Sequence, residues 1–435
     1  MIKHIAENPV TFPEGMLWGT ATAAHQIEGD NIHSQLWFYE THPELKGFDI
    51  TGNLPSPKYE EPSGKACDHW NLFEEDFQRM QDAGLNFYRM GIEWCRIEPE
   101  EGKCDETAVL HYLEMLKSLK AKKIKVMVTL HHFTHPLWFE QKGAFFKREN
   151  NAYFLRWVEK AVRTFGSYVD YWCTFNEMTG AAGVTLEDVR KYGGRLTNML
   201  HAHGQAYRLL KANSSAPIGI AHMAVGTFPL RDRLQGDVLM ADWYDYLMNE
   251  GLIHALRTGR VQLPFTDEEY FPELIQSFDY WGLNYYYGMP CRIGAKSSAW
   301  ATYEPLKLDS TWQMLYPQGL IAFFNRLLPD NKPFIITESG MYTEDDRKRI
   351  EYLIYHFWAL GEGIKQGAKI TGYLHWSFMD NYEWGSYKPK YGMHSFDPVT
   401  MKRTAKPSWD FFSRVAKENK LTVSPELLKA INCAE

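Results

Sequence analysis

The chain has 435 residues, and its 54 acidic against 47 basic side chains give a formal net charge of −7. This negative balance, without a basic run, argues against a nucleic-acid-binding surface and leaves a small molecule as the expected partner. The content of 45% hydrophobic and 23% charged residues is typical of a globular protein, and no stretch has the length of an apolar membrane span.

The first residues and the cysteines predict a cytoplasmic protein. Residues 1–19 lack the uninterrupted apolar segment of a secretory signal. Without such a signal we expect reduced thiols rather than disulfides. The six cysteines are scattered and include no CxxC pair: Cys67, Cys95, Cys104, Cys173, Cys291 and Cys433.

Short apolar segments alternate with amphipathic ones along the whole chain. Eight of the short segments are predicted strands: 16–23, 86–93, 124–131, 171–176, 218–224, 280–285, 334–338 and 372–376. The amphipathic segments are predicted helices: 70–83, 106–121, 152–166, 195–212, 240–258, 345–361 and 408–417. Strands and helices that alternate in this way are typical of parallel βαβ units, and eight such units close into a barrel.

We therefore predict an α/β fold, in which residues 1–435 form a single catalytic (β/α)8 TIM barrel domain with long loops at its C-terminal face. The alternative is an open doubly wound sheet, which would normally carry a glycine-rich turn after an early strand, and that turn is missing after Gly19. Loops that follow barrel strands gather at one face and build the binding site. The longest predicted loops are 42–64, 179–194, 289–319 and 382–391.

Two glutamates stand at matching positions, each at the end of a predicted strand. Glu177 follows the strand 171–176, and Glu338 ends the strand 334–338. They are far apart in sequence, so only the closed barrel would bring them together. Two carboxyl groups that flank one bond, one protonated and one ionised, are what glycoside hydrolysis requires. On this pattern alone, two unrelated surface glutamates remain an alternative.

The segments around both glutamates add a specific resemblance. The sequences TFNEM at Glu177 and ITESG at Glu338 are similar to the two catalytic segments of glycoside hydrolase family 1, the retaining β-glycosidases. Five more segments resemble family motifs in the same order: FPEGMLWGTATAAHQIEG, FYRMGIEWCRIEPEEG, VTLHHFTHPLWF, WGLNYYYG and LHWSFMDNYEWG. The resemblance therefore runs through nearly the whole chain.

The resemblance implies a role for each catalytic position. Glu338 would be the nucleophile that forms a glycosyl–enzyme ester, and Glu177 would be the acid and then the base. Arg89 would lower the pKa of the nucleophile, and Tyr286 would donate a hydrogen bond to it. Asn176 would hold the sugar 2-hydroxyl. The two carboxyl groups should lie about 5–5.5 Å apart, as in other retaining enzymes.

The resemblance also implies a set of residues that bind the non-reducing sugar. Trp376 would form the floor on which the sugar ring stacks, and the remaining members would bind its outer hydroxyl groups. These members are Gln26, His132, Glu383 and Trp384.

We expect a retaining O-glycosyl hydrolase of the β-glucosidase type, which acts on oligosaccharides or on aryl and alkyl glycosides. Its substrates would carry a terminal β-D-glucosyl residue, with β-D-galactosyl and β-D-fucosyl residues as further candidates. A 6-phospho-β-glycosidase is the nearest alternative, because Ser386, Lys388 and Tyr391 have the residue types of a phosphate site. The carboxylate of Glu383 would, however, repel a phosphate. A transglycosidase with the same two glutamates and a non-catalytic carbohydrate-binding protein also remain open.

Some positions depart from the family pattern. Phe133 stands where most members have a tryptophan. The ring NH of that tryptophan would donate to a hydroxyl group of the sugar, and without it we expect this hydroxyl group to be less well bound. His25 and His131 also replace other residue types. His131 and His135 could form a zinc site only if they shared a helix face, and the HExxH motif is missing. We expect no cofactor and no metal, and the sequence does not predict the oligomeric state.

Overall fold

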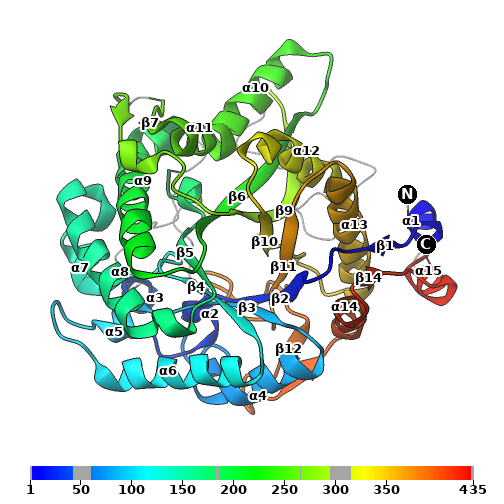
Figure 1. Cartoon of the computed structure of the whole chain (residues 1–435), viewed down its shortest axis with the longest axis horizontal. Coiled ribbons are helices and arrows are strands. Elements are labelled where there is room, and N and C mark those ends of the chain that lie inside the picture. The colour runs from blue at the N-terminus through cyan, green and yellow to red at the C-terminus, as the bar shows by residue number, and fades with distance from the viewer. Residues whose placement is uncertain (1, 43–59, 183–185, 265, 294–314, 433–435) are drawn as a thin grey trace.

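Eight parallel strands close into a barrel in this computed structural model, which confirms the predicted (β/α)8 architecture (Figure 1). The structure describes residues 2–42, 60–182, 186–264, 266–293 and 315–432. The strands follow one another around the barrel in chain order, and the last pairs with the first. They are β2 (Leu17–Ala21), β3 (Phe87–Gly91), β4 (Lys125–Thr129), β5 (Tyr171–Asn176), β6 (Ile218–Pro229), β9 (Trp281–Cys291), β10 (Phe334–Glu338) and β11 (Ile370–Trp376).

The apolar runs of these strands are explained by burial on both faces. In β10 all five residues are buried, with Ile335 directed into the barrel and Ile336 into the layer between strands and helices. We call the residues that fill the barrel the inner cluster. Nearly every strand contributes to it: Leu17, Phe87, Met127, Cys173, Ala221, Ile335 and Leu374, with Tyr280 just ahead of β9.

Helices surround the barrel, as Figure 1 shows. The longer ones are α4 (His69–Asp82), α6 (Glu106–Ala121), α8 (Asn151–Phe165), α9 (Leu186–Asn213), α10 (Gln235–Asp245), α11 (Gly251–Thr258), α12 (Pro317–Leu327), α13 (Asp346–Lys365) and α14 (Pro407–Glu418). The shorter or terminal ones are α1 (Ile2–Glu7), α2 (Ala24–Ile27), α3 (Gln35–Thr41), α5 (Trp94–Ile97), α7 (Leu137–Gln141) and α15 (Pro425–Asn432). No helix in the described ranges is long and apolar enough to cross a membrane.

The predicted loop 179–194 is wrong in its second half, because α9 already begins at Leu186. The helix continues through Gly193 and Gly194. Close packing accounts for the glycine at position 193, since a Cβ atom there would lie 3.1 Å from Cγ2 of Thr266. The predicted helix 240–258 is divided instead, with a π-helical turn at Tyr246–Glu250 between α10 and α11.

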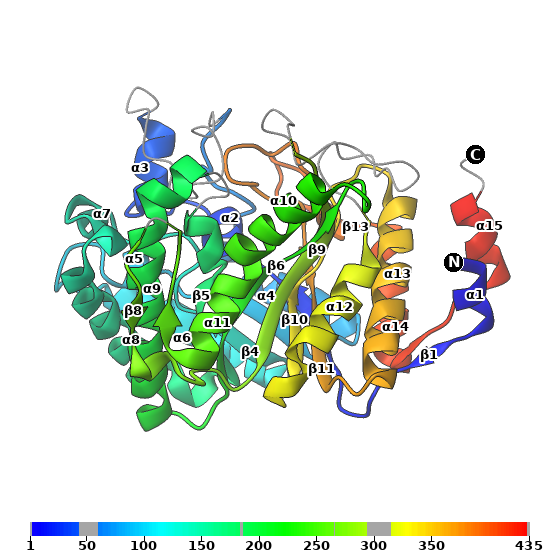
Figure 2. The same ribbon diagram turned by 90° about the horizontal axis from the view of Figure 1, so that it is seen from above.

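Strands β6 and β9 continue past their predicted ends as one paired arm, which carries α10 outward from the barrel (Figures 1 and 2). The predicted loop 289–319 therefore begins within β9 and ends within α12. Its residues 294–314, like residues 43–59 of the loop 42–64, lie outside the described part of the chain.

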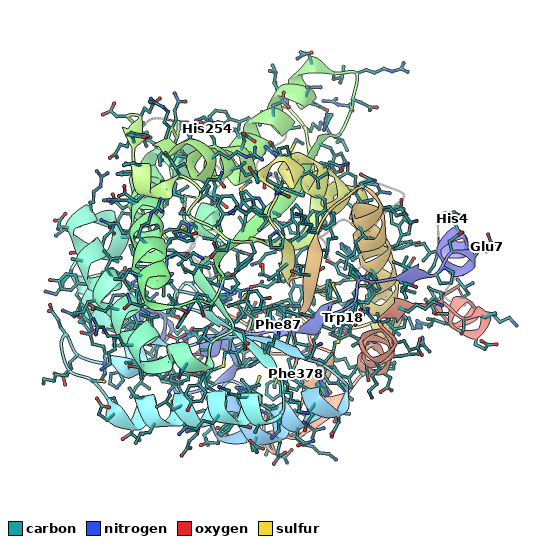
Figure 3. The ribbon with its side chains drawn as sticks, in the orientation of Figure 1. His4, Glu7, Trp18, Phe87, His254 and Phe378 are labelled. Atoms are coloured by element: carbon teal, nitrogen blue, oxygen red, sulfur yellow. The ribbon has the colours of Figure 1, made fainter. Side chains whose placement is uncertain are left out.

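Segments from the two ends of the described chain meet beside α13. Strand β1 (Val10–Thr11) pairs with β14 (Lys420–Leu421), and Nε1 of Trp18 donates to Oδ1 of Asn419 over 3.0 Å. Figure 3 places Trp18 and Phe87 on barrel strands, whereas His4 and Glu7 lie on the outlying α1. The N-terminal segment thereby lies against the last helices, just ahead of β2, whose pairing with β11 closes the barrel.

Candidate active site

Both predicted glutamates lie at the carboxyl end of the barrel. Glu338 ends β10 and is 3% exposed, whereas Glu177 follows β5 and is half-buried. Glu177 has a φ of 48°, and its backbone N–H donates to the carbonyl of Ala221 over 2.7 Å. A left-handed backbone at a residue other than glycine costs about 1–3 kcal/mol, and such outliers concentrate at functional sites.

The carboxylate of Glu338 is held by two strong donors. Arg89 on β3 donates from Nη1 to Oε1 over 2.5 Å, and the hydroxyl of Tyr286 on β9 donates to Oε2 over 2.5 Å. Arg89 is completely buried, and its Nε donates to the hydroxyl of Thr129 over 2.9 Å. The position of the guanidinium group is therefore fixed before any substrate binds.

The carboxyl group of Glu177 has a different partner, Asn284 on β9. The Asn284 amide nitrogen donates to Oε1 of Glu177 over 2.8 Å and to Oδ1 of Asn176 over 3.0 Å. That oxygen of Asn176 also accepts from Nη2 of Arg89 over 2.6 Å. In the β9–β10 register Asn284 stands opposite Glu338, so it lies between the two glutamates.

Asn284 was not among the residues predicted from the sequence. It is part of the WGLNYYYG segment, two residues before Tyr286. The signal that could have revealed it is an amide inside an otherwise apolar strand, where a polar side chain needs a partner. The residues predicted as catalytic thus lie together at the carboxyl end of the barrel, with Asn284 in contact with two of them.

The two glutamates differ in their electrostatic surroundings. Burial and the charge of Glu338 raise the pKa of Glu177 to about 8. Burial also raises the pKa of Glu338 above its ordinary value, although Arg89, Tyr286 and Asn284 all lower it. Glu338 therefore has more groups that stabilise its ionised form, and a shared proton is held more readily by Glu177.

The predicted sugar-binding residues gather next to Glu338. Nε2 of His132 lies 4.0 Å from Oε1 of Glu338. Nε2 of Gln26 donates to Oε2 of Glu383 over 3.0 Å. Burial, followed by the charge of Glu338, raises the pKa of Glu383 to about 8. Oε1 of Gln26 and Nδ1 of His132 are buried and have no hydrogen-bond partner among the described residues.

Aromatic rings complete this side of the site. The ring of His132 lies 5.9 Å from both Trp376 and Trp384, measured between ring centroids. Phe133 packs edge-on against Trp384 at 5.1 Å. His25 lies parallel to Trp384 at 6.2 Å, and its Nε2 pairs with Oε1 of Glu40 over 2.9 Å. Phe133 and Trp384 both have positive φ, 67° and 47°, so their backbone is strained like that of Glu177.

The histidines considered for zinc have other contacts. Nε2 of His131 lies 3.3 Å from Nδ1 of His135, and Nε2 of His135 contacts Oε2 of Glu140 over 2.8 Å. Among the residues that the structure describes, no group of three or more potential ligands could hold a metal ion.

Comparison with known proteins gives a consistent result. Residues 8–421 match the model of glycosyl hydrolase family 1. The 1,4-beta-D-glucan glucohydrolase of Thermotoga neapolitana is 29% identical, with 94% of this chain and 99% of that protein covered. Beta-glucosidase A of Thermotoga maritima is 28% identical, covering 95% and 99% respectively.

A solved structure extends the similarity to three dimensions. The beta-glycosidase from Pyrococcus horikoshii has a TM-score of 0.82 and 32% identity, with 97% of this chain and 98% of that chain covered. The family 1 beta-glucosidase from Thermotoga maritima also has a TM-score of 0.82, with 26% identity and coverage of 95% and 99%.

Proposed function

The chain belongs to glycosyl hydrolase family 1, and from this membership we propose that it is a retaining β-glycosidase. Its substrates carry a terminal non-reducing β-D-glucosyl residue, with β-D-galactosyl and β-D-fucosyl residues as further candidates. The leaving groups are sugars, phenols or alkyl alcohols.

The unequal surroundings of the two glutamates carry this proposal. Glu338 contacts the guanidinium of Arg89 and the hydroxyl of Tyr286, which favour its ionised form. Glu177 has a pKa of about 8 and keeps its proton near neutral pH. One carboxylate and one carboxylic acid are the two forms that the first step requires.

In the first step, an oxygen of Glu338 attacks the anomeric carbon of the sugar. The bond from that carbon to the leaving oxygen breaks, and Glu177 gives its proton to this oxygen. The products are a glycosyl ester on Glu338, a free alcohol or phenol, and an ionised Glu177. The ester also removes the negative charge of Glu338, which had raised the pKa of Glu177.

In the second step, water attacks the anomeric carbon and the ester bond breaks. Glu177 takes a proton from the water, so that both glutamates return to their starting forms and the sugar keeps its β configuration. Asn284 donates to Glu177 and stands opposite Glu338 in the β9–β10 register, where it lowers the pKa of Glu338. An amide that acts on both groups fits the retaining spacing of about 5–5.5 Å better than the inverting spacing of about 6.5–9.5 Å.

The sugar is proposed to bind over Trp376, with its outer hydroxyl groups at Gln26, His132, Glu383 and Trp384. The unpartnered buried atoms of Gln26 and His132 support this placement. A buried polar atom without a partner costs about 1–3 kcal/mol, and a sugar hydroxyl would satisfy it. Asn176 uses its oxygen for Arg89 and Asn284, so its amide nitrogen is the atom that would hold the 2-hydroxyl.

Contacts of Glu60 weigh against the 6-phospho-β-glycosidase alternative. Ser386 donates to Oε2 of Glu60 over 3.0 Å, and Nζ of Lys388 pairs with the same oxygen over 2.8 Å. A phosphate bound by Ser386 and Lys388 would meet this carboxylate. Tyr391 is buried, and its ring lies 6.1 Å from that of Tyr286.

A panel of aryl substrates tests the substrate class. We expect turnover of the β-glucoside to exceed that of its 6-phosphate, with the galactoside and fucoside also accepted and the mannoside slow. Faster turnover of the 6-phosphate would select the alternative. Product analysis at high acceptor concentration separates hydrolysis from transglycosylation.

Loss of the nucleophile tests the mechanism. Glu338→Gly should abolish hydrolysis, and added azide should restore turnover by attacking the anomeric carbon in place of the carboxylate. Wild-type activity in this variant would contradict the mechanism and would also revive the non-catalytic alternative.

We also propose that residues 1–435 form one catalytic unit, that the protein is cytoplasmic, and that it uses no nucleic acid, metal or cofactor. The single unit is supported by the pairing of β1 with β14 across the chain. The location is supported by the described cysteines, which are free thiols: Cys67, Cys95, Cys104, Cys173 and Cys291.

A further inference from the structure

A continuous series of hydrogen bonds links Arg89 to both glutamates. Nη1 of Arg89 donates to Glu338 directly. Nη2 donates to Oδ1 of Asn176, the Asn284 amide nitrogen donates to the same oxygen, and that nitrogen also donates to Oε1 of Glu177. Arg89, Asn176 and Asn284 are at most 1% exposed, so the bonds among these three residues are shielded from water, and half-buried Glu177 lies at the outer end of the series.

The direction of these bonds is dictated by Arg89. A guanidinium group can only donate, so the atom of Asn176 that faces it has to be the amide oxygen. This oxygen also faces Asn284, which therefore has to present its amide nitrogen there. Because both hydrogens of that nitrogen are directed outward, one to Asn176 and one to Glu177, Asn284 is fixed as a donor to Glu177.

Thr337 holds the other end of the Asn284 amide. Its hydroxyl donates to Oδ1 of Asn284 over 2.7 Å, and Thr337 is completely buried on β10. The methyl group of Thr337 packs against Gly282, where a Cβ atom would lie 3.0 Å from it. Thr337 thus satisfies the buried amide oxygen and keeps Asn284 in place next to Glu177.

We propose that Asn284 is a positioning residue for Glu177, that Arg89 sets its orientation through Asn176, and that Thr337 anchors it. This inference rests on the proposed function, in which Glu177 acts as acid and base. A single arginine then acts on both halves of the double displacement, directly on the nucleophile and through two amides on the acid.

The position of Asn284 also has an electrostatic consequence. Its hydrogen bond lowers the pKa of Glu177, against the larger upward effects of burial and Glu338. Removal of the donor should therefore raise this pKa further. A substitution that merely loosened the site and admitted water would do the opposite, because hydration stabilises the ionised carboxylate.

The test uses the full chain with two aryl β-glucosides. One has 2,4-dinitrophenol as its leaving group, which departs without protonation, and the other has 4-methylphenol, which needs the proton of Glu177. In Asn284→Ala we expect kcat/KM for the 4-methylphenyl substrate to fall roughly tenfold to a hundredfold more than for the dinitrophenyl substrate. In the same variant, the alkaline limit of kcat/KM for the 4-methylphenyl substrate should also move to higher pH.

The Thr337 variants test the anchor. Thr337→Val should show the same selective loss at a smaller scale, and Thr337→Ser, which keeps the hydroxyl, should restore the wild-type ratio of the two rates. In the Asn284→Ala background, Thr337→Val should have no further effect on that ratio. Thr371→Val is the matched control, because its hydroxyl donates to the carbonyl of Phe334 on the neighbouring strand, outside the site.

The positioning role of Asn284 would be overturned if Asn284→Ala lowered kcat/KM equally for both substrates. It would also be overturned if the alkaline limit of kcat/KM stayed unchanged or moved to lower pH. If Thr337→Val does not fold, Thr337→Ala replaces it, and the dinitrophenyl rate reports whether each variant is intact. Glu338→Gly with azide is measured in parallel. Failure of azide rescue would remove the proposed function itself, whereas successful rescue with equal losses in Asn284→Ala would reject this inference alone.

Discussion

Replacing Glu177 by glutamine should stabilise the folded protein, and the gain should grow as the pH rises from about 5 to about 8. Burial and the charge of Glu338 raise the pKa of Glu177 from its ordinary 4.5 to about 8. Between these two values the folded protein keeps a proton on Glu177 that the unfolded chain has released. The free energy of unfolding therefore falls as the pH rises through this window. Glutamine has no proton to lose and avoids this decline.

The magnitude follows from the size of the pKa shift. A full shift of this size corresponds to about 4 kcal/mol at pH 8. Because Glu177 is half-buried and coupled to Glu338, we expect the gain to be smaller, about 2–3 kcal/mol more at pH 8 than at pH 5.

Urea unfolding of both proteins at the two pH values measures this difference, read from the midpoints at an unchanged slope. The matched control is Glu75→Gln, which removes an exposed carboxyl group on α4. Because this carboxyl group is exposed, its replacement should change the free energy of unfolding only slightly. A gain for Glu177→Gln that is constant, or that shrinks as the pH rises, would refute the raised pKa of this group.

Further predictions concern activity. The alkaline limit of kcat/KM for a 4-methylphenyl glucoside should lie near pH 8, because Glu177 with a pKa of about 8 must be protonated to act as acid. Arg89→Met should lower kcat at least about a hundredfold in steady-state assays, since Glu338 and Asn176 lose their common donor. Arg89→Lys should recover only part of this activity, because a single ammonium group cannot donate to both residues as the two guanidinium nitrogens do. Gln26→Leu should lower kcat/KM for the glucoside about tenfold or more, because Glu383 loses its amide donor. Steady-state rates measure this loss, and circular dichroism spectra that match those of the wild type show that the variant is folded.

The barrel could be predicted because burial on both faces leaves a clear pattern. The segments 171–176 and 334–338 match β5 and β10 in full, since each is an apolar run that ends where the chain leaves the core. The same reasoning placed Glu177 and Glu338 at one face, because the carboxyl ends of parallel strands meet there. Pattern and topology were sufficient for these two positions.

Other features depend on contacts that no local pattern reveals. Asn284 acquires its place from the β9–β10 register and from Thr337 on the facing strand, and neither is visible in WGLNYYYG. The outward arm formed by β6 and β9 requires that both strands lengthen together, which neither segment indicates separately.

The inner cluster has a consequence for the order in which molecules leave the enzyme. It fills the barrel below Arg89 with buried side chains, Cys173 and Met127 among them, so the sugar can only arrive from the strand ends. The part of the substrate beyond the scissile bond then departs first, and the sugar, seated deepest, departs last. The released monosaccharide is thus the ligand that meets the empty enzyme, and we expect it to inhibit competitively as it accumulates.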